Sequence, residues 1–243
     1  MLRKLLVVAA AAALAACGPG ACTEERAAPK SQVFVLVDMS ETWHGPSFAA
    51  KNRRVLSEVG EGIVIGLRNW DTPVGVQYRT FGGASVGREP ICDVVYTTTL
   101  APTKSTAEYE IKQVAELKRF LGFDCPHKIV AQKGEPLTEI TAALISIASQ
   151  DAGGSPRRYL IVLSDFLEET PNPVPLTADL EGWRVLLLYR PVPADLSNPA
   201  AMRARIDQWK QALVAVGADV ADMPDTGLKR TAVADFLVPA VAQ

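Results

Sequence analysis

One short group of oxygen-bearing side chains stands out in this sequence as a candidate for metal chemistry. Asp38, Ser40 and Thr42 occupy alternate positions directly after an unbroken apolar run. One carboxylate and two hydroxyls are hard oxygen donors, which are the ligands that Mg²⁺ prefers in proteins. The spacing allows both hydroxyls to turn toward one ion, which Asp38 would approach directly or through water. We therefore interpret this group as part of a metal site.

The element that must position these side chains is the apolar run before them, residues 33–37. A continuous run of Val, Phe and Leu is typical of a parallel strand that is covered on both faces. Ligands of open α/β sheets gather at the carboxyl ends of such strands. The sequence therefore places Asp38 where a binding site is expected.

Further strands and helices alternate along the chain, which favours an α/β fold with a doubly wound, mostly parallel sheet flanked by helices. Periodicity and turn residues predict strands over 73–81, 91–100, 159–163 and 183–189, with 91–100 pairing antiparallel to 73–81 at a sheet edge. They predict helices over 48–67, 104–121, 137–149, 200–216 and, less clearly marked, 231–241. The runs 195–199 and 222–225 are interpreted as solvated loops.

At this point the sequence resembles a known family. Asp38-x-Ser40-x-Thr42 after the first strand, Thr138 at the head of a helix and Asp165 after a central strand look like the metal-ion-dependent adhesion site of von Willebrand factor type A domains. The resemblance covers roughly residues 32–220. It implies a Rossmann-like fold and a site in which Thr138 supplies another oxygen and Asp165 holds a coordinated water.

Two positions depart from the family pattern. Thr42 stands where the family usually has Ser, with the same hydroxyl, and Phe166 stands where the family has Gly after the later Asp. The second change is expected to reshape the loop after Asp165.

The resemblance also implies a function. In the family, a Glu or Asp of a partner protein fills the open position on a bound Mg²⁺ or Mn²⁺, and no reaction is catalysed. By this resemblance the chain binds an unknown protein partner through the ion and is not an enzyme. Trp43 and His44 border the site and are candidates for contact with that partner.

Other interpretations of the same residues remain open. Asp, Ser and Thr are preferred at helix N-termini, so these residues could cap helices on a scaffold whose metal site is empty. A magnesium-dependent phosphatase of the haloacid dehalogenase type would use Asp38, but Ser40 replaces its acidic proton donor. Residues 83–87 match Gly-x-Ser-x-Gly, yet a turn and a strand follow them instead of the helix that a serine hydrolase requires.

The first residues predict export and a lipid anchor. Arg3 and Lys4 precede an apolar stretch that is too short to span a bilayer, and the stretch ends at Leu14-Ala15-Ala16-Cys17, which resembles the lipobox of bacterial lipoproteins. We expect a signal peptide over 1–16, acylation of Cys17, a flexible tether over 17–31 and a single domain over 32–243. The chain would then be extracytoplasmic, on the outer membrane and facing the periplasm if the host has two membranes.

The cysteines and the net charge indicate a disulfide and argue against nucleic-acid and zinc binding. With Cys17 acylated, Cys92 and Cys125 are the expected disulfide partners within the domain, and Cys22 is the odd thiol of the tether. The formal net charge is −2 for the 243 residues and becomes more negative once Arg3 and Lys4 are removed, which argues against nucleic-acid binding. A zinc site is not favoured, because the ligand spacings typical of zinc are absent from the sequence.

Overall fold

A computed structural model describes residues 31–68, 70, 72–83, 88–97, 104–150, 157–169 and 176–238, without the side chains of 104–107 and 109. The signal peptide, Cys17, Cys22, the tether up to residue 30, and residues 84–87 lie outside the described residues. Within the described part of the chain, no helix is long and apolar enough to cross a bilayer.

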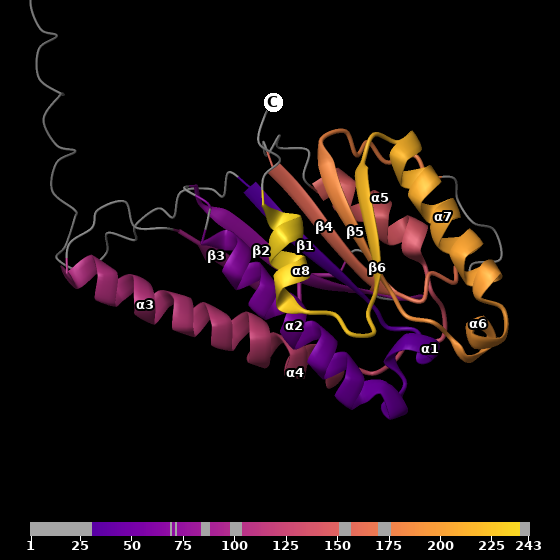
Figure 1. The fold of residues 1–243 in the computed structure, drawn as a ribbon, viewed down its shortest axis with the longest axis horizontal. Helices are drawn as coiled ribbons and strands as arrows, with labels where there is room; N and C mark the ends of the chain where they lie inside the picture. The colour runs from indigo at the N-terminus through magenta and orange to yellow at the C-terminus, as the bar shows by residue number, and fades with distance from the viewer. Residues whose placement is uncertain are drawn as a thin grey trace, which may run out of the picture.

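A six-stranded sheet forms the middle of the molecule (Figure 1). Its strands are β1 (Ser31–Asp38), β2 (Val74–Phe81), β3 (Cys92–Tyr96), β4 (Arg157–Ser164), β5 (Trp183–Tyr189) and β6 (Asp219–Pro224), in the order β3-β2-β1-β4-β5-β6. All neighbours pair in parallel except β2 and β3, which are antiparallel as predicted. The α/β fold class with a mostly parallel sheet is therefore confirmed.

The two central strands, β1 and β4, lead into two of the loops that carry the candidate site residues. Val37 pairs with Leu163, so Asp38 and Ser164 follow the pair at the same edge of the sheet. Both strands are buried on both faces, which explains their continuous apolar sequence.

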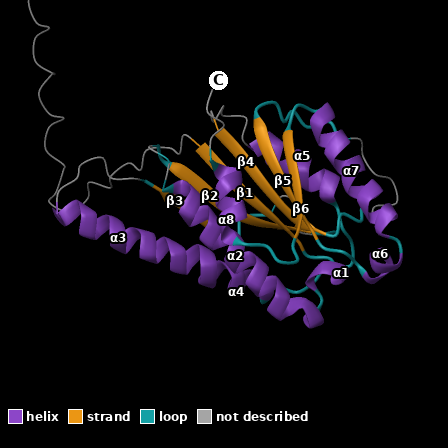
Figure 2. Cartoon of the chain, in the orientation of Figure 1, coloured by secondary structure: helices purple, strands orange, loops and turns teal. Residues whose placement is uncertain are grey.

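Helices cover both faces of the sheet (Figure 2). They are α1 (Glu41–His44), the 3₁₀ turn η1 (Pro46–Phe48), α2 (Ala49–Leu67), α3 (Lys104–Arg119), the π-helical turn η2 (Phe120–Asp124), α4 (Cys125–Val130), α5 (Ile140–Gln150), α6 (Pro193–Ser197), α7 (Pro199–Ala215) and α8 (Arg230–Leu237). Alternate residues of β1 divide the core: Val33, Val35 and Val37 pack with α2, α4 and α8, whereas Phe34 and Leu36 pack with α5 and α7.

Most elements lie where the sequence predicts them, but two predicted loops are wrong. Residues 222–225 belong largely to β6, and residues 195–199 span the end of α6 and the start of α7. The short edge strand β6 alternates exposed and half-buried residues and carries Asp219 and Asp222, so it lacks the apolar run that marks a central strand. The strand predicted over 91–100 is observed as β3, which ends at Tyr96, and residues 98–100 lie outside the described residues.

A disulfide and a close packing contact fix α4 and η2 on the side of the sheet that α2 covers. Cys92 of β3 and Cys125 of α4 form a disulfide, with their Cα atoms 6.1 Å apart. Next to it, η2 lies so close to α2 that a Cβ at Gly60 would sit 2.0 Å from the Leu121 carbonyl oxygen. Only glycine allows this approach.

Candidate metal centre

Asp38, the last residue of β1, is fully buried at the carboxyl edge of the sheet. Its Oδ1 accepts a hydrogen bond from the Ser40 amide at 2.7 Å, and its Oδ2 accepts one from Ser164 Oγ at 2.6 Å. Burial raises the pKa of Asp38 to about 7, although both hydrogen bonds oppose that shift, and the nearby charge of Asp165 raises it further. The side chain is thus held in place but needs a compensating positive charge to ionise easily.

Ser40 and Thr42 present their hydroxyls side by side. The Ser40 Oγ and Thr42 Oγ1 atoms are 3.0 Å apart. Ser40 stands at the N-cap of α1, yet its side chain makes no capping hydrogen bond. Two adjacent ligands of an octahedral Mg²⁺, each about 2.1 Å from the ion, also lie about 3 Å apart. The separation is that of a hydrogen bond between the two hydroxyls, and it is also compatible with a pair of metal ligands.

Thr138 is buried just before α5, and its hydroxyl has no hydrogen-bond partner among the described residues. The helix does not use it as a cap, because the amides of Ile140 and Thr141 donate to Glu168 Oε2 at 3.1 and 3.3 Å. An unpartnered buried hydroxyl is destabilising unless something else binds it. The capping interpretation of Thr138 is therefore wrong, and its Oγ1 is available to a ligand.

Asp165 follows β4 and is also buried. Its Oδ1 accepts a hydrogen bond from the Leu167 amide at 3.0 Å, whereas its Oδ2 has no partner within the described part of the chain. A buried carboxylate oxygen without a donor is costly, and a bound cation or its water would satisfy it.

Two backbone hydrogen bonds and one between side chains join the three loops that carry these residues. The Glu135 amide donates to the Met39 carbonyl at 2.7 Å, which places the loop before Thr138 beside Ser40. The Glu169 amide donates to the Thr138 carbonyl at 3.1 Å, which ties that loop to the one after Asp165. The hydrogen bond between Ser164 and Asp38 joins the first loop to the third.

The candidate donor set consists of two carboxylates and three hydroxyls, all of them hard ligands. Among the residues that the structure describes, no cluster of three or more His, Cys, Asp or Glu side chains is placed to hold a metal. A cation at this site would therefore depend on the Ser and Thr oxygens as well as on the two aspartates. That composition suits Mg²⁺ or Mn²⁺ and not a soft metal such as Cu(I).

Phe166 keeps the loop after Asp165 in a conformation that glycine adopts easily. Its φ is +60°, and it is the only non-glycine residue with positive φ in the described ranges. A phenylalanine in this backbone region adds strain of about 1–2 kcal/mol. The ring is buried among the apolar side chains of the α5 and α7 face.

The expected partner contact at Trp43 and His44 is wrong in this structure. Trp43 is 0% exposed, and its ring packs against the Arg190 guanidinium, 4.7 Å from the ring centroid. His44 is 7% exposed, and its Nε2 lies 3.1 Å from the Gln132 carbonyl. Because α1 is a helix and not an exposed loop, its second half turns inward, and only Glu41 and Thr42 remain at the surface.

Sequence patterns alone missed two residues that support the site. Ser164 bridges the two acidic loops, and its place directly before Asp165 was the available signal. Arg190 at the end of β5 donates to Asp225 Oδ2 at 2.6 Å, to Asn52 Oδ1 at 2.6 Å and to the Trp43 carbonyl at 3.2 Å. These bonds fix the position of α1 relative to α2 and to the end of β5, and no sequence spacing predicts them.

No protein-family model matches the chain, and no curated protein matches it in sequence. Several solved structures are similar. An aerotolerance-related membrane protein from Bacteroides fragilis is 17% identical, with a TM-score of 0.41. The match covers 85% of this chain and 96% of that protein's chain. A von Willebrand factor type A protein from Catenulispora acidiphila is 14% identical, with a TM-score of 0.40 and coverage of 86% and 42%. The manganese-loaded TRAP protein of Plasmodium vivax is 10% identical, with a TM-score of 0.36 and coverage of 87% and 75%.

With TM-scores below 0.5, the residues of this chain itself must carry any functional conclusion. The sheet order puts β1 and β4 side by side, and the loops that bear Asp38, Thr138 and Asp165 are joined at the carboxyl edge of these strands. The chain is thus an α/β protein with a mostly parallel six-stranded sheet, which is the fold class that its sequence predicts.

Proposed function

We propose that the chain binds Mg²⁺ or Mn²⁺ through Asp38, Ser40, Thr42, Thr138 and Asp165, and through the ion an acidic side chain of a protein partner. The observation that carries this proposal is the pair of buried, unpartnered oxygens, Thr138 Oγ1 and Asp165 Oδ2. They belong to loops that hydrogen bonds join to each other and to Asp38. A cation is the simplest group that satisfies both of them.

Exposure and charge support a partner that approaches from one side. Asp38, Ser40, Thr138 and Asp165 are buried, whereas Thr42 is exposed at the rim. Thr42 therefore offers a side from which a ligand could reach the ion. Two carboxylates would bring a divalent ion near neutrality, so an added anionic ligand is not repelled.

The location of the chain is part of the same proposal. A lipid on Cys17 and the tether that follows would hold the domain outside the cytoplasm, facing the periplasm from the outer membrane of a two-membrane host. The support is the basic, apolar and Leu-Ala-Ala-Cys sequence of the first 17 residues.

The burial of Asp38 weighs against the phosphatase alternative. A nucleophilic aspartate must bring a carboxylate oxygen to the substrate phosphorus, but both oxygens of Asp38 accept hydrogen bonds and the residue is fully buried. Phosphate-ester turnover that disappears in Asp38→Asn would nevertheless establish the enzyme.

The proposal is tested with the purified full chain and Mn²⁺ by water-proton relaxation. Bound Mn²⁺ with an open position should enhance relaxation, and a short peptide with one Glu should reduce the enhancement by displacing the water. The same peptide with Gln should not do so. Thr42→Val should weaken Mn²⁺ binding, whereas Ser47→Ala, which removes an exposed hydroxyl nearby, should not. Absence of enhancement in the unmodified chain would refute the metal site.

A further inference from the structure

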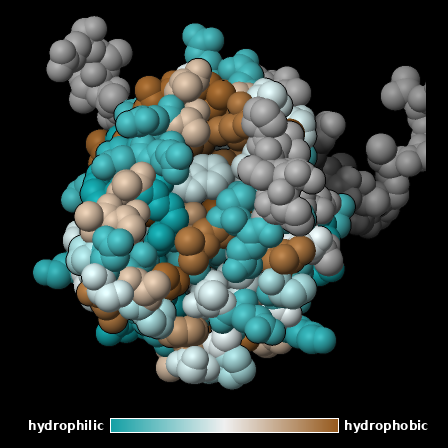
Figure 3. Space-filling model, turned by 90° about the vertical axis from the view of Figure 1, so that its right-hand side faces the viewer, coloured by the Kyte–Doolittle hydropathy of each residue, from teal (hydrophilic) through white to brown (hydrophobic). Residues whose placement is uncertain are grey.

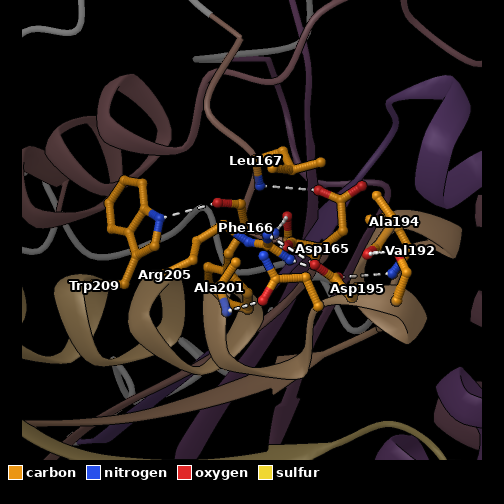
Figure 4. Close-up of polar contacts among 12 residues, drawn as sticks. Asp165, Phe166, Leu167, Val192, Ala194, Asp195, Ala201, Arg205 and Trp209 are labelled. Atoms are coloured by element: carbon orange, nitrogen blue, oxygen red, sulfur yellow. Dashed lines mark hydrogen bonds and ion pairs between the residues drawn. The ribbon is translucent and has the colours of Figure 1, made fainter.

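Helix α7 contacts the backbone of the third metal loop directly. Arg205 Nε donates a hydrogen bond to the Asp165 carbonyl at 3.1 Å, and Trp209 Nε1 donates one to the Phe166 carbonyl at 3.1 Å (Figure 4). Arg205 and Trp209 are four residues apart, so both side chains leave the same face of the helix. Two successive peptide groups next to the metal site are thus held from one helix.

Arg205 is itself held firmly. Its Nη1 and Nη2 donate to Asp195 of α6 at 3.1 and 2.7 Å, and the Val192 amide donates to Asp195 Oδ2 at 2.9 Å. Burial works to raise the pKa of Asp195, but the hydrogen bonds from Arg205 and Val192 keep that pKa below its usual value. A two-pronged ion pair fixes the plane of the guanidinium as well as its position.

This contact meets the backbone where it is strained. Phe166 has φ of +60°, and its amide donates to Ser164 Oγ at 2.8 Å while its carbonyl accepts from Trp209. The Phe166 ring also packs near that of Trp209, with centroids 6.3 Å apart. An unfavourable φ persists only where surrounding contacts determine it, and such residues cluster at functional sites.

The consequence concerns Asp165 Oδ2, the unpartnered buried oxygen. Its direction depends on the peptide group between Phe166 and Leu167, because the Leu167 amide donates a hydrogen bond to the other oxygen, Oδ1. If the loop relaxed to negative φ at Phe166, that amide and the carboxylate would turn together. The hydrogen bonds from Arg205 and Trp209 to the Asp165 and Phe166 carbonyls therefore keep the Asp165 carboxylate in one orientation before an ion binds.

We propose that Arg205 and Trp209 are positioning residues for the metal site, which hold the loop of Asp165 and Phe166 in its cation-binding form. The proposal rests on the proposed metal-binding function. The charge of Arg205 is neutralised by Asp195, so the effect is geometric and not a repulsion of the cation. Outer residues that orient metal ligands typically change metal affinity about 10–100-fold when they are replaced.

The test compares Mn²⁺ affinity by calorimetry with the melting temperature in a chelator, using the full chain. Trp209→Phe keeps an aromatic ring and removes the N–H donor, and it should weaken Mn²⁺ binding about tenfold. Arg205→Lys keeps the charge without the planar fork and should weaken binding similarly. The matched control is Arg203→Ala on the same helix, which loses exposed ion pairs with Asp207 and Asp222 but no contact to the loop.

The outcomes separate the two proposals. Weaker binding in Trp209→Phe and Arg205→Lys with unchanged affinity in Arg203→Ala supports the positioning role. Unchanged Mn²⁺ affinity in both variants, whether or not they melt earlier in chelator, overturns it and leaves the metal site standing. If the unmodified chain binds no Mn²⁺, both proposals fail. If Arg205→Lys does not fold, Trp209→Phe alone decides.

Discussion

At the scale of single residues, Asp38 links the structure of the site to its chemistry. It is fully buried, accepts two short hydrogen bonds and still has a pKa raised to about 7 by burial. The metal-free site therefore exchanges a proton near neutral pH, and a cation that needs the carboxylate must compete with that proton.

This competition predicts a pH dependence with a defined sign. Because the folded pKa of Asp38 is raised from 3.8 to about 7, the metal-free fold loses stability from this group as pH rises through that window. Cation binding should restore that stability, so added Mg²⁺ should raise the melting temperature more at about pH 8 than at about pH 6. Melting curves at both pH values, with and without the ion, check this. An equal increment at both would contradict it.

Thr138 gives the second prediction at this scale. Thr138→Val keeps the shape and removes the buried hydroxyl that has no partner among the described residues. The metal-free protein should be as stable or more stable, because an unsatisfied polar group is lost, while Mn²⁺ affinity should fall about tenfold or more. Calorimetry and chelator melts measure the two effects. Thr138→Ser, which keeps the oxygen, is the control, and a clear loss of metal-free stability in Thr138→Val would indicate a structural role instead.

Several side chains of the proposed site carry a signal in the sequence, and the residues that support them do not. Asp38, Ser40, Thr42, Thr138 and Asp165 carry a local signal, because each follows a strand or precedes a helix of recognisable pattern. Ser164, Arg190 and Arg205 act through hydrogen bonds to residues far away in sequence, and no spacing indicates such contacts. The prediction that Trp43 contacts a partner was wrong for a related reason, because its burial against Arg190 depends on packing between α1 and the end of β5.

At the scale of elements, the central strands and the antiparallel edge strand β3 were predictable, whereas the other edge strand, β6, was not. β1 and β4 are continuous apolar runs because both of their faces are covered. β6 is short, polar and on the edge, and α6 has only five residues, so tertiary contacts decide their structure. The π-helical turn η2 likewise follows from its fit against Gly60 of α2 and not from a local pattern.

The disulfide makes a prediction at this scale. It joins β3 to α4 across 33 residues, on the α2 side of the sheet. Replacing both Cys92 and Cys125 by Ser should lower the free energy of unfolding by about 2–4 kcal/mol, since the unfolded chain gains freedom. Mn²⁺ affinity should stay the same, because neither cysteine contacts the metal loops. Denaturant unfolding measures the first effect, with Cys22→Ser as the control, and an unchanged unfolding free energy would show that the pair adds no stability.

At the scale of the whole molecule, the described chain starts at the edge opposite the metal site. β1 begins at Ser31 and ends at Asp38, so these ends are separated by roughly 25 Å along the strand. A tether entering at Ser31 would leave the site facing away from an anchoring membrane. On the side that carries α6 and α7, hydrophilic and hydrophobic residues are interspersed (Figure 3). Leu196 of α6 and Val214 of α7 are exposed.

The anchor itself can be tested on the whole protein. Cys17→Ser should prevent acylation and release the chain from the membrane fraction, because a signal peptide and a single site supply the only lipid in this account. Mn²⁺ affinity should not change, since the site lies at the opposite edge of the sheet. Fractionation after expression, with Cys22→Ser as the control, checks this. A chain that stays in the membrane fraction after Cys17→Ser would refute anchoring at this residue.

The most direct test of the metal site is a calorimetric titration of Mn²⁺ into the full chain and into Asp38→Asn, with metal-free melting curves of both. Asn keeps the size of the side chain and removes the buried charge. We predict saturable binding that is lost in the variant, together with a metal-free stability above pH 7 that is higher in the variant, because the buried charge is absent. No saturable binding by the unmodified chain, or equal binding by Asp38→Asn, would contradict the central claim.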